Sequence, residues 1–211
     1  MRTVRLEDVA GIPVEGQNGL VWKPVRACLG IQAFGINAYT ASEAGEQVVE
    51  EHDELGGGAG KHEELYVVVN GSARFTVDGA TFEAPAGTCV FLDDPGERRA
   101  AVALEAGTTV LAIGGERGQP FRVSPWEFNF RAAAAPTPAE ARAIVEEGLA
   151  EYPGKGALLY NLACYEALDG ARETALEHIR AAVEDDPKLL AYTATDADLE
   201  SIRSDPRFPT S

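Results

Sequence analysis

Short runs of β-branched and aromatic residues, separated by glycine-containing turns, dominate the chain up to about residue 130. Such runs between turn residues predict short strands joined in an antiparallel sandwich or barrel. Asn70-Gly71 is the clearest hairpin signal, because a two-residue type I′ turn needs positive φ at both positions, and Asp78-Gly79 is a second such pair. The strands predicted most directly are 65–69, 73–77, 88–92 and 108–113.

Beyond residue 131 the apolar positions recur with the helical period of about 3.6 residues. We therefore predict a β domain at 1–131, a linker at 132–138 where four alanines lead into two prolines, and a helical domain at 138–211. Thr137 before Pro138 predicts an N-cap followed by proline at the first helical position. The predicted helices are 138–151, 156–168 and 171–184.

The helical half contains an internal repeat, since a shift of 34 residues places Pro187 on Pro153. The segment 156–187 resembles one tetratricopeptide repeat, although Glu166 stands where that repeat usually has tyrosine. The resemblance implies a short helical domain that binds a protein partner, the β domain or another subunit. An ordinary helical hairpin is the alternative.

Charge excludes some partners. The chain has 18 basic and 34 acidic residues and a net charge of −16, so its surface repels phosphate backbones and anionic lipid headgroups. No apolar run approaches the roughly 18 residues of a membrane helix. We therefore expect neither nucleic acid nor membrane as a partner.

Cysteine usage and the start of the chain predict the compartment. Cys28, Cys89 and Cys164 are scattered and lack CxxC spacing, which favours reduced thiols, and each is expected to be a small buried side chain. The first residues do not read as a secretory leader. We expect a cytoplasmic protein.

Two of the three histidines fall in one short acidic window, and this is the candidate chemistry of the chain. His52 and Glu54 share one face of a predicted strand, and His62 and Glu64 share one face of the next. If these strands pair along one ladder, the four side chains converge on one point. Imidazole and carboxylate ligands together suit Mn, Fe, Ni or Zn better than Ca or Mg.

The region 45–103 resembles a cupin, a small double-stranded β-helix barrel. Where the first cupin motif has its second histidine, this chain has Glu54, and His62, beyond a glycine-rich insertion at 55–61, can supply the missing imidazole. The resemblance implies a metal site of His52, Glu54, His62 and Glu64. The matching residues are Gly45, His52, Glu64 and Gly71 in the first motif, and Pro85-Ala86-Gly87 and Asp94-Pro95-Gly96 in the second.

The second motif departs from the cupin pattern at Arg99, three residues after Gly96, where the family places its last metal-binding histidine. A guanidinium stays protonated and cannot bind a metal. Arg99 is therefore expected to pair with Glu64 or Glu54, or to bind a carboxylate or phosphate of a small ligand, with Tyr66 as a second ligand-binding residue. A bound metal, a metal-free ligand pocket and a salt-bridged core remain open.

The leading functional hypothesis is a non-catalytic barrel that binds a small molecule or metal and is joined to a protein-interaction helical domain. The alternative is a metal-dependent oxygenase or isomerase that uses His52, His62 and Glu64. A third is a structural dimer with a vestigial pocket. We expect a homodimer because the apolar runs 19–22 and 31–36 exceed what a minimal barrel needs and leave an edge to cover.

Overall fold

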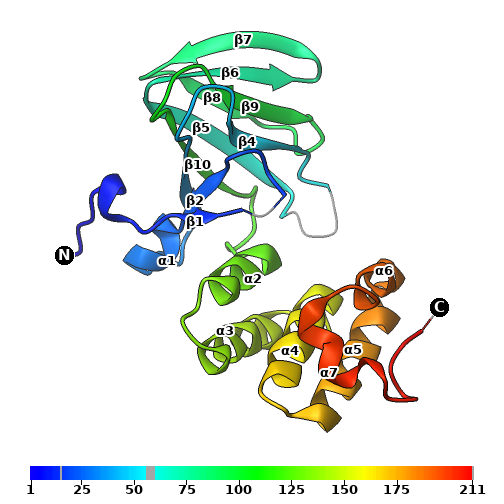
Figure 1. Ribbon diagram of the computed structural model, residues 1–211. Helices are drawn as coiled ribbons and strands as arrows, with labels where there is room; N and C mark the ends of the chain where they lie inside the picture. The colour runs from blue at the N-terminus through cyan, green and yellow to red at the C-terminus, as the bar shows by residue number, and fades with distance from the viewer. Residues whose placement is uncertain (15, 56–59, 211) are drawn as a thin grey trace. The chain divides into compact units, whose positions relative to one another are not determined.

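The structure is a computed structural model that describes residues 1–14, 16–55 and 60–210. It divides into two compact units, Met1–Val123 and Ser124–Ser211. The first, the β unit, holds the strands, and the second, the helical unit, consists of helices (Figure 1). Among the residues described, no helix is both long and apolar enough to cross a membrane.

Two antiparallel sheets build the β unit (Figure 1). The larger has the strand order β1-β2-β3-β10-β5-β8 and the smaller has the order β4-β9-β6-β7. The prediction of an antiparallel β domain is confirmed. Most neighbouring strands are distant in sequence, so long connections join them. The strands are β1 (Ile12–Pro13), β2 (Val21–Lys23), β3 (Gly35–Thr40), β4 (Gln47–His52), β5 (His62–Asn70), β6 (Ser72–Val77), β7 (Ala80–Pro85), β8 (Cys89–Leu92), β9 (Arg99–Ala103) and β10 (Thr109–Glu116).

The core of the β unit lies between the two sheets, because each strand turns alternate side chains inward. Val68 and Val110 from the larger sheet and Val48 and Phe75 from the smaller one are fully buried in the same apolar cluster. Tyr66 belongs to this cluster too, so its ring is part of the core while its hydroxyl is available for polar contacts.

The outer face of β5 is also apolar. Leu65 lies beside Phe91 of β8 and Ile113 of β10, and together they line a hollow of about 370 Å³ on this face. Phe91 is 57% exposed. The homodimer expected from the sequence stays a prediction.

One of the two predicted hairpin turns is confirmed and the other is wrong. Asp78 and Gly79 both have positive φ and join β6 to β7 in a two-residue hairpin, as predicted. The hairpin at Asn70-Gly71 is wrong, because β5 and β6 belong to different sheets. Gly71 instead turns the chain from one sheet to the other with φ of 70°, and a Cβ there would lie 2.5 Å from Oγ1 of Thr108.

The N-terminal segment adds a 3₁₀ turn, η1 (Leu6–Asp8), and a short helix, α1 (Val25–Leu29). Cys28 in α1 and Cys89 in β8 are exposed, and Cys164 alone of the three is buried. The expectation of three buried thiols is therefore wrong for two of them, because Cys28 and Cys89 lie on outward-facing positions.

The helical unit confirms the predicted helix positions to within one residue. Thr137 caps α3 as expected, since its side chain accepts a hydrogen bond from the Glu140 backbone N–H, and Pro138 is the first helical residue. The tetratricopeptide resemblance stays a prediction. The elements are α2 (Pro125–Ala133), α3 (Pro138–Glu151), α4 (Gly156–Leu168), α5 (Arg172–Asp185), η2 (Pro187–Leu189), α6 (Leu190–Thr193), η3 (Ala197–Leu199) and α7 (Glu200–Arg203).

The boundary between the units lies at Val123/Ser124, earlier than the 132–138 linker expected from the sequence. The difference arises because Pro125 starts a helix, α2, that the strand-rich pattern before it concealed. This helix packs on α3 so closely that a Cβ on Gly148 would lie 2.8 Å from Cγ of Phe128. It therefore belongs to the helical unit.

Glu166, the residue at the usual tyrosine position of the repeat, is buried in α4 with 4% of its surface exposed. His178 of α5 lies 2.7 Å from its carboxylate, measured from Nδ1 to Oε2. The two helices are thus joined by a polar contact within an apolar interface.

Candidate metal centre

The candidate residues come from both sheets. His52 is the last residue of β4 in the smaller sheet, and Glu64 is the third residue of β5 in the larger sheet. The expectation that their strands pair along one ladder is wrong, since β4 pairs with β9 while β5 pairs with β10 and β8. The side chains meet across the space between the sheets instead.

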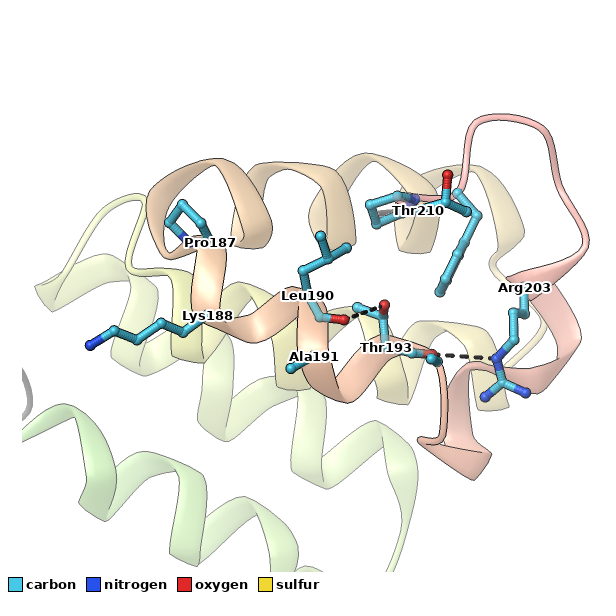
Figure 2. A pocket seen from close by; sticks show the side chains of 10 residues that line it. Pro187, Lys188, Leu190, Ala191, Thr193, Arg203 and Thr210 are labelled. Carbon is cyan, nitrogen blue, oxygen red and sulfur yellow. Dashed lines mark hydrogen bonds between the residues drawn. The ribbon is translucent and has the colours of Figure 1, made fainter.

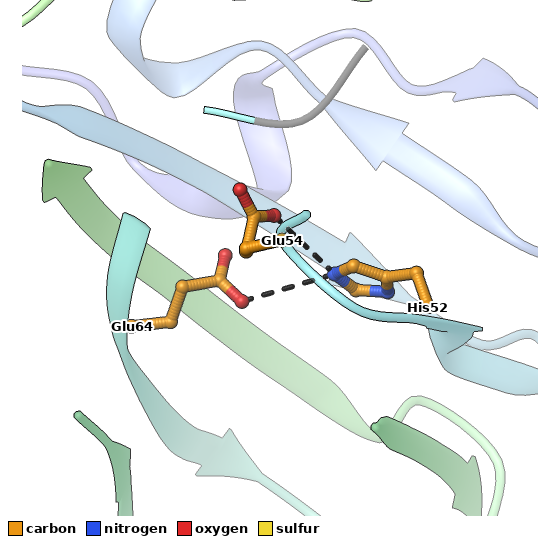
Figure 3. A group of neighbouring side chains, drawn as sticks. All are labelled: His52, Glu54 and Glu64. Atoms are coloured by element: carbon orange, nitrogen blue, oxygen red, sulfur yellow. Dashed lines mark ion pairs between the residues drawn. The ribbon is translucent and has the colours of Figure 1, made fainter. Parts of the chain in front are cut away.

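Three side chains form the cluster: His52, Glu54 and Glu64 each offer a ligand atom within 4.8 Å of the others (Figure 3). Nε2 of His52 lies 3.6 Å from Oε1 of Glu54 and 3.8 Å from Oε2 of Glu64. The His52 side chain is 27% exposed and the two carboxylates are about 10% exposed, so the imidazole lies nearest to solvent.

The imidazole of His52 is oriented by the backbone. Its Nδ1 lies 2.8 Å from the carbonyl oxygen of Glu50, and because a carbonyl only accepts, Nδ1 carries a proton and donates it. The other nitrogen, Nε2, is left to face the carboxylates. Metal-binding histidines are commonly fixed in this way through the nitrogen that does not bind the metal.

The charges around His52 change its protonation. Burial acts to lower the pKa of His52, but the Glu64 carboxylate, the Glu50 carbonyl and the Glu54 carboxylate together outweigh burial and raise it above its usual 6.5. The imidazolium is therefore favoured when no other cation is present between the carboxylates.

Glu54 lies in the turn after β4, not in a strand. Its Oε2 accepts hydrogen bonds from the backbone N–H groups of Gly60, at 2.9 Å, and His62, at 3.4 Å. These bonds hold Oε1 toward His52. Gly60 was not predicted as part of the site. The sequence signal that could have pointed to it is its position two residues before the candidate ligand His62.

His62, predicted as a ligand, contacts the cluster only through Glu54, with 3.7 Å between its Nδ1 and Oε2 of that carboxylate. Its ring lies against Phe121, with 6.1 Å between ring centroids. A Cβ on Gly60 would fall 2.0 Å from Nε2 of His62, so a larger residue there would displace the His62 ring. Residues 56–59 of the predicted insertion lie outside the described residues.

Tyr66 donates a short hydrogen bond to Oε2 of Glu64 on the same face of β5. Burial acts to raise the pKa of Glu64, but His52, the Tyr66 hydroxyl and Arg99 outweigh it, so that the pKa is lowered. Burial and the Glu64 charge raise the pKa of Tyr66 well above its usual range. Glu64 is therefore ionised and Tyr66 stays a donor.

Arg99 lies inside the β unit, fully buried, on β9 directly opposite His52 in the ladder. Of the two acceptors that the sequence proposed, it faces Glu64, with 3.5 Å between Nε and Oε2. Its Nη1 lies 3.4 Å from the Pro95 carbonyl oxygen, and in the part of the chain that the structure describes its Nε and Nη2 have no hydrogen-bond partner. Arg98, by contrast, points outward to Glu51.

The cluster fits a transition metal ion. Metal bonds to nitrogen and oxygen of about 2.0–2.2 Å place neighbouring ligand atoms roughly 3.0–3.6 Å apart in tetrahedral or octahedral geometry. The separations of 3.6 and 3.8 Å from His52 are within a few tenths of an ångström of that range. They are too long for hydrogen bonds, because a donor–acceptor separation of about 3.6 Å or more no longer counts as one.

A second group, Cys164 with Asp196 and Asp198, lies in the helical unit. Burial and the Asp196 charge raise the pKa of the Cys164 thiol, which keeps it protonated. Asp196 is already used, because it accepts from the Tyr160 hydroxyl at 2.9 Å and from the Asp198 backbone at 3.0 Å. These contacts give Asp196 a structural role in the helical unit.

The helical unit also has an apolar groove of about 610 Å³ between Leu190 and Phe208 (Figure 2). Arg203 lies at its border, but its Nε donates to the Thr193 carbonyl and its Nη2 to the Asp196 carbonyl. The guanidinium therefore fixes the backbone of this region, and the groove has no cluster of reactive groups.

No protein-family model matches the sequence, and no curated protein matches it either. Solved structures resemble the chain over about half of its length. A cupin-superfamily sugar phosphate isomerase from Silicibacter pomeroyi is 17% identical with a TM-score of 0.44, covering 54% of this chain and 75% of its own. An RmlC-like cupin from Shewanella frigidimarina is 18% identical with a TM-score of 0.40, covering 56% and 94%.

The polyketide cyclase RemF from Streptomyces resistomycificus is 18% identical with a TM-score of 0.45, and the match covers 61% of this chain and 92% of that one. The names of these proteins state different activities. The function is therefore argued from the geometry of this chain's own cluster.

Proposed function

We propose that the β unit is a cupin-like barrel that binds one divalent transition metal ion between His52, Glu54 and Glu64. Such an ion would be Mn, Fe, Ni or Zn, whose sites combine imidazole and carboxylate ligands. Metal binding is common to two of the hypotheses drawn from the sequence, the binding protein and the metal-dependent enzyme, and is absent from the third.

One observation carries the proposal. Nε2 of His52 faces two carboxylates at 3.6 and 3.8 Å, while Nδ1 is occupied by the Glu50 carbonyl. In the neutral imidazole this nitrogen presents a lone pair toward the two carboxylates, so the three side chains offer one nitrogen and two oxygen ligand atoms to a cation. A divalent ion that displaces the His52 proton would be held by all three.

Elemental analysis of the purified protein after incubation with Ni²⁺ or Zn²⁺ and desalting is expected to find about one ion per chain. His52→Ala should abolish retention of the ion, because it removes the only nitrogen ligand of the cluster. His62→Ala should weaken affinity by about tenfold, since His62 acts only through Glu54.

The matched control is His178→Ala, which removes the third histidine from the helical unit and should leave the stoichiometry unchanged. Circular dichroism confirms that each variant is folded. Substoichiometric metal that His52→Ala does not alter would reject the proposal and favour the structural alternative.

Metal affinity is expected to depend on pH in one direction. The metal must displace the proton from His52, whose pKa is raised above 6.5, so affinity should rise about tenfold per pH unit up to that raised pKa and level off above it. Calorimetric titration with Zn²⁺ or Ni²⁺ at pH values below and above 6.5 checks this. An affinity that stays constant across that interval would show that His52 is not a ligand.

A further inference from the structure

Arg99 has two buried donors that no described residue of the β unit accepts as a hydrogen bond. Its side chain is fully buried, and Nε and Nη2 have no hydrogen-bond partner among residues 1–14, 16–55 and 60–210. Ion pairs of arginine with carboxylates normally close to about 2.7–2.9 Å, whereas Arg99 lies 3.5 Å from Oε2 of Glu64. The guanidinium is thus paired with Glu64 at a distance longer than a direct hydrogen bond.

Metal binding would weaken the ion pair between Arg99 and Glu64. Oε2 of Glu64 already accepts the Tyr66 hydroxyl and faces both His52 and Arg99. If Glu64 binds the metal, the charge it shares with Arg99 is drawn to the ion, and the guanidinium is left with no full counter-charge. A buried charge without a partner is strongly disfavoured.

The charges of the metal-bound cluster also do not balance. A divalent ion, two ionised carboxylates and one guanidinium sum to a formal charge of about +1, with His52 neutral. Three protein ligands leave open positions on the metal. One small monoanion would balance the charge and complete the coordination.

We infer that Arg99 and the metal together bind a small carboxylate, with one oxygen on the metal and the other on the donors of Arg99. This inference rests on the proposed metal site. The planar fork of a guanidinium matches a carboxylate, and formate and acetate are the simplest ligands that carry one. Phosphate, with a charge nearer −2 at neutral pH, would overcompensate the cluster.

Linkage gives the test, because a carboxylate that needs both groups must bind cooperatively with the metal. Calorimetric titration of the full chain with Co²⁺ is carried out alone, with acetate, and with the neutral isostere acetamide. Acetate should raise the Co²⁺ affinity about tenfold and acetamide should not. Acetate also binds free Co²⁺ weakly, but that effect lowers the apparent affinity and cannot imitate the expected gain.

Arg99→Gln removes the guanidinium and should abolish the acetate effect while Co²⁺ binding persists. Arg99→Lys, which keeps the charge without the fork, should reduce the effect and serves if the glutamine variant does not fold. Equal Co²⁺ affinity of the wild-type protein with acetate and with acetamide would overturn the inference, as would coupling with inorganic phosphate alone. If the wild type binds no Co²⁺ under any condition, the metal proposal itself fails.

Discussion

Replacing Arg99 with alanine is expected to lower the free energy of unfolding of the β unit by about 3 kcal/mol. Arg99 is fully buried beside Glu64, which is itself only 8% exposed. Its removal leaves an ionised carboxylate without its cation and a cavity where the side chain packed. The melting temperature of the β unit should fall by roughly 10 °C.

Tryptophan fluorescence during urea unfolding can follow the β unit alone. Trp22 is fully buried in the β unit and Trp126 belongs to the helical unit, so a Trp126→Phe background leaves one reporter. Arg98→Ala is the matched control. Arg98 pairs with Glu51 at the surface, and its loss should leave the melting temperature nearly unchanged.

The charge and the packing of Arg99 can be separated. Arg99→Met keeps much of the volume, and combining it with Glu64→Gln removes the unpaired carboxylate. The double variant should be more stable than the sum of the two single effects implies. A melting temperature of Arg99→Ala equal to that of Arg98→Ala would contradict the buried ion pair.

Phe75→Ala is expected to cost about 4 kcal/mol, the larger of the two effects. The Phe75 ring is fully buried in the core, stacks on Phe82 at 5.7 Å between centroids, and contacts the Tyr66 ring at 5.8 Å. Its removal opens a cavity behind Tyr66, whose hydroxyl donates to Glu64. Loss of stability should therefore come with weaker metal binding.

The comparison for Phe75 is Phe82→Ala, on the neighbouring strand β7. Phe82 is 41% exposed, so its truncation removes less buried surface and should cost about 1 kcal/mol. Urea unfolding measures both variants in the same single-tryptophan background. Equal losses for the two phenylalanines would show that the core does not depend on Phe75.

Local pattern was enough to predict most elements. The 3.6-residue period and the Thr137-Pro138 signal depend only on neighbouring residues, and they placed α3 and α4 correctly. Turn chemistry was sufficient at Asp78-Gly79 because both residues adopt positive φ. The same chemistry failed at Asn70-Gly71, where the glycine is required by the approach of Thr108 from a distant part of the chain.

The sequence predicted which residues lie near one another at the candidate site better than it predicted how the strands bring them together. His52, Glu54 and Glu64 meet as expected, but through convergence of two sheets, and strand pairing over long separations leaves no trace in local alternation. His62 was expected as an equal ligand because it is close in sequence. In the structure it reaches only Glu54 of the three, at 3.7 Å, and its ring lies beside Phe121, a residue far along the chain.

The two faces of β5 restrict how this protein can change during evolution. Glu64 and Tyr66 point into the cluster, while Leu65 on the same strand lines the outer hollow. A deletion of one residue inside β5 would exchange these faces, exposing the carboxylate outside and placing leucine where the metal is proposed to bind. Substitutions can accumulate in this strand one face at a time, whereas changes of length are confined to the segments that flank it.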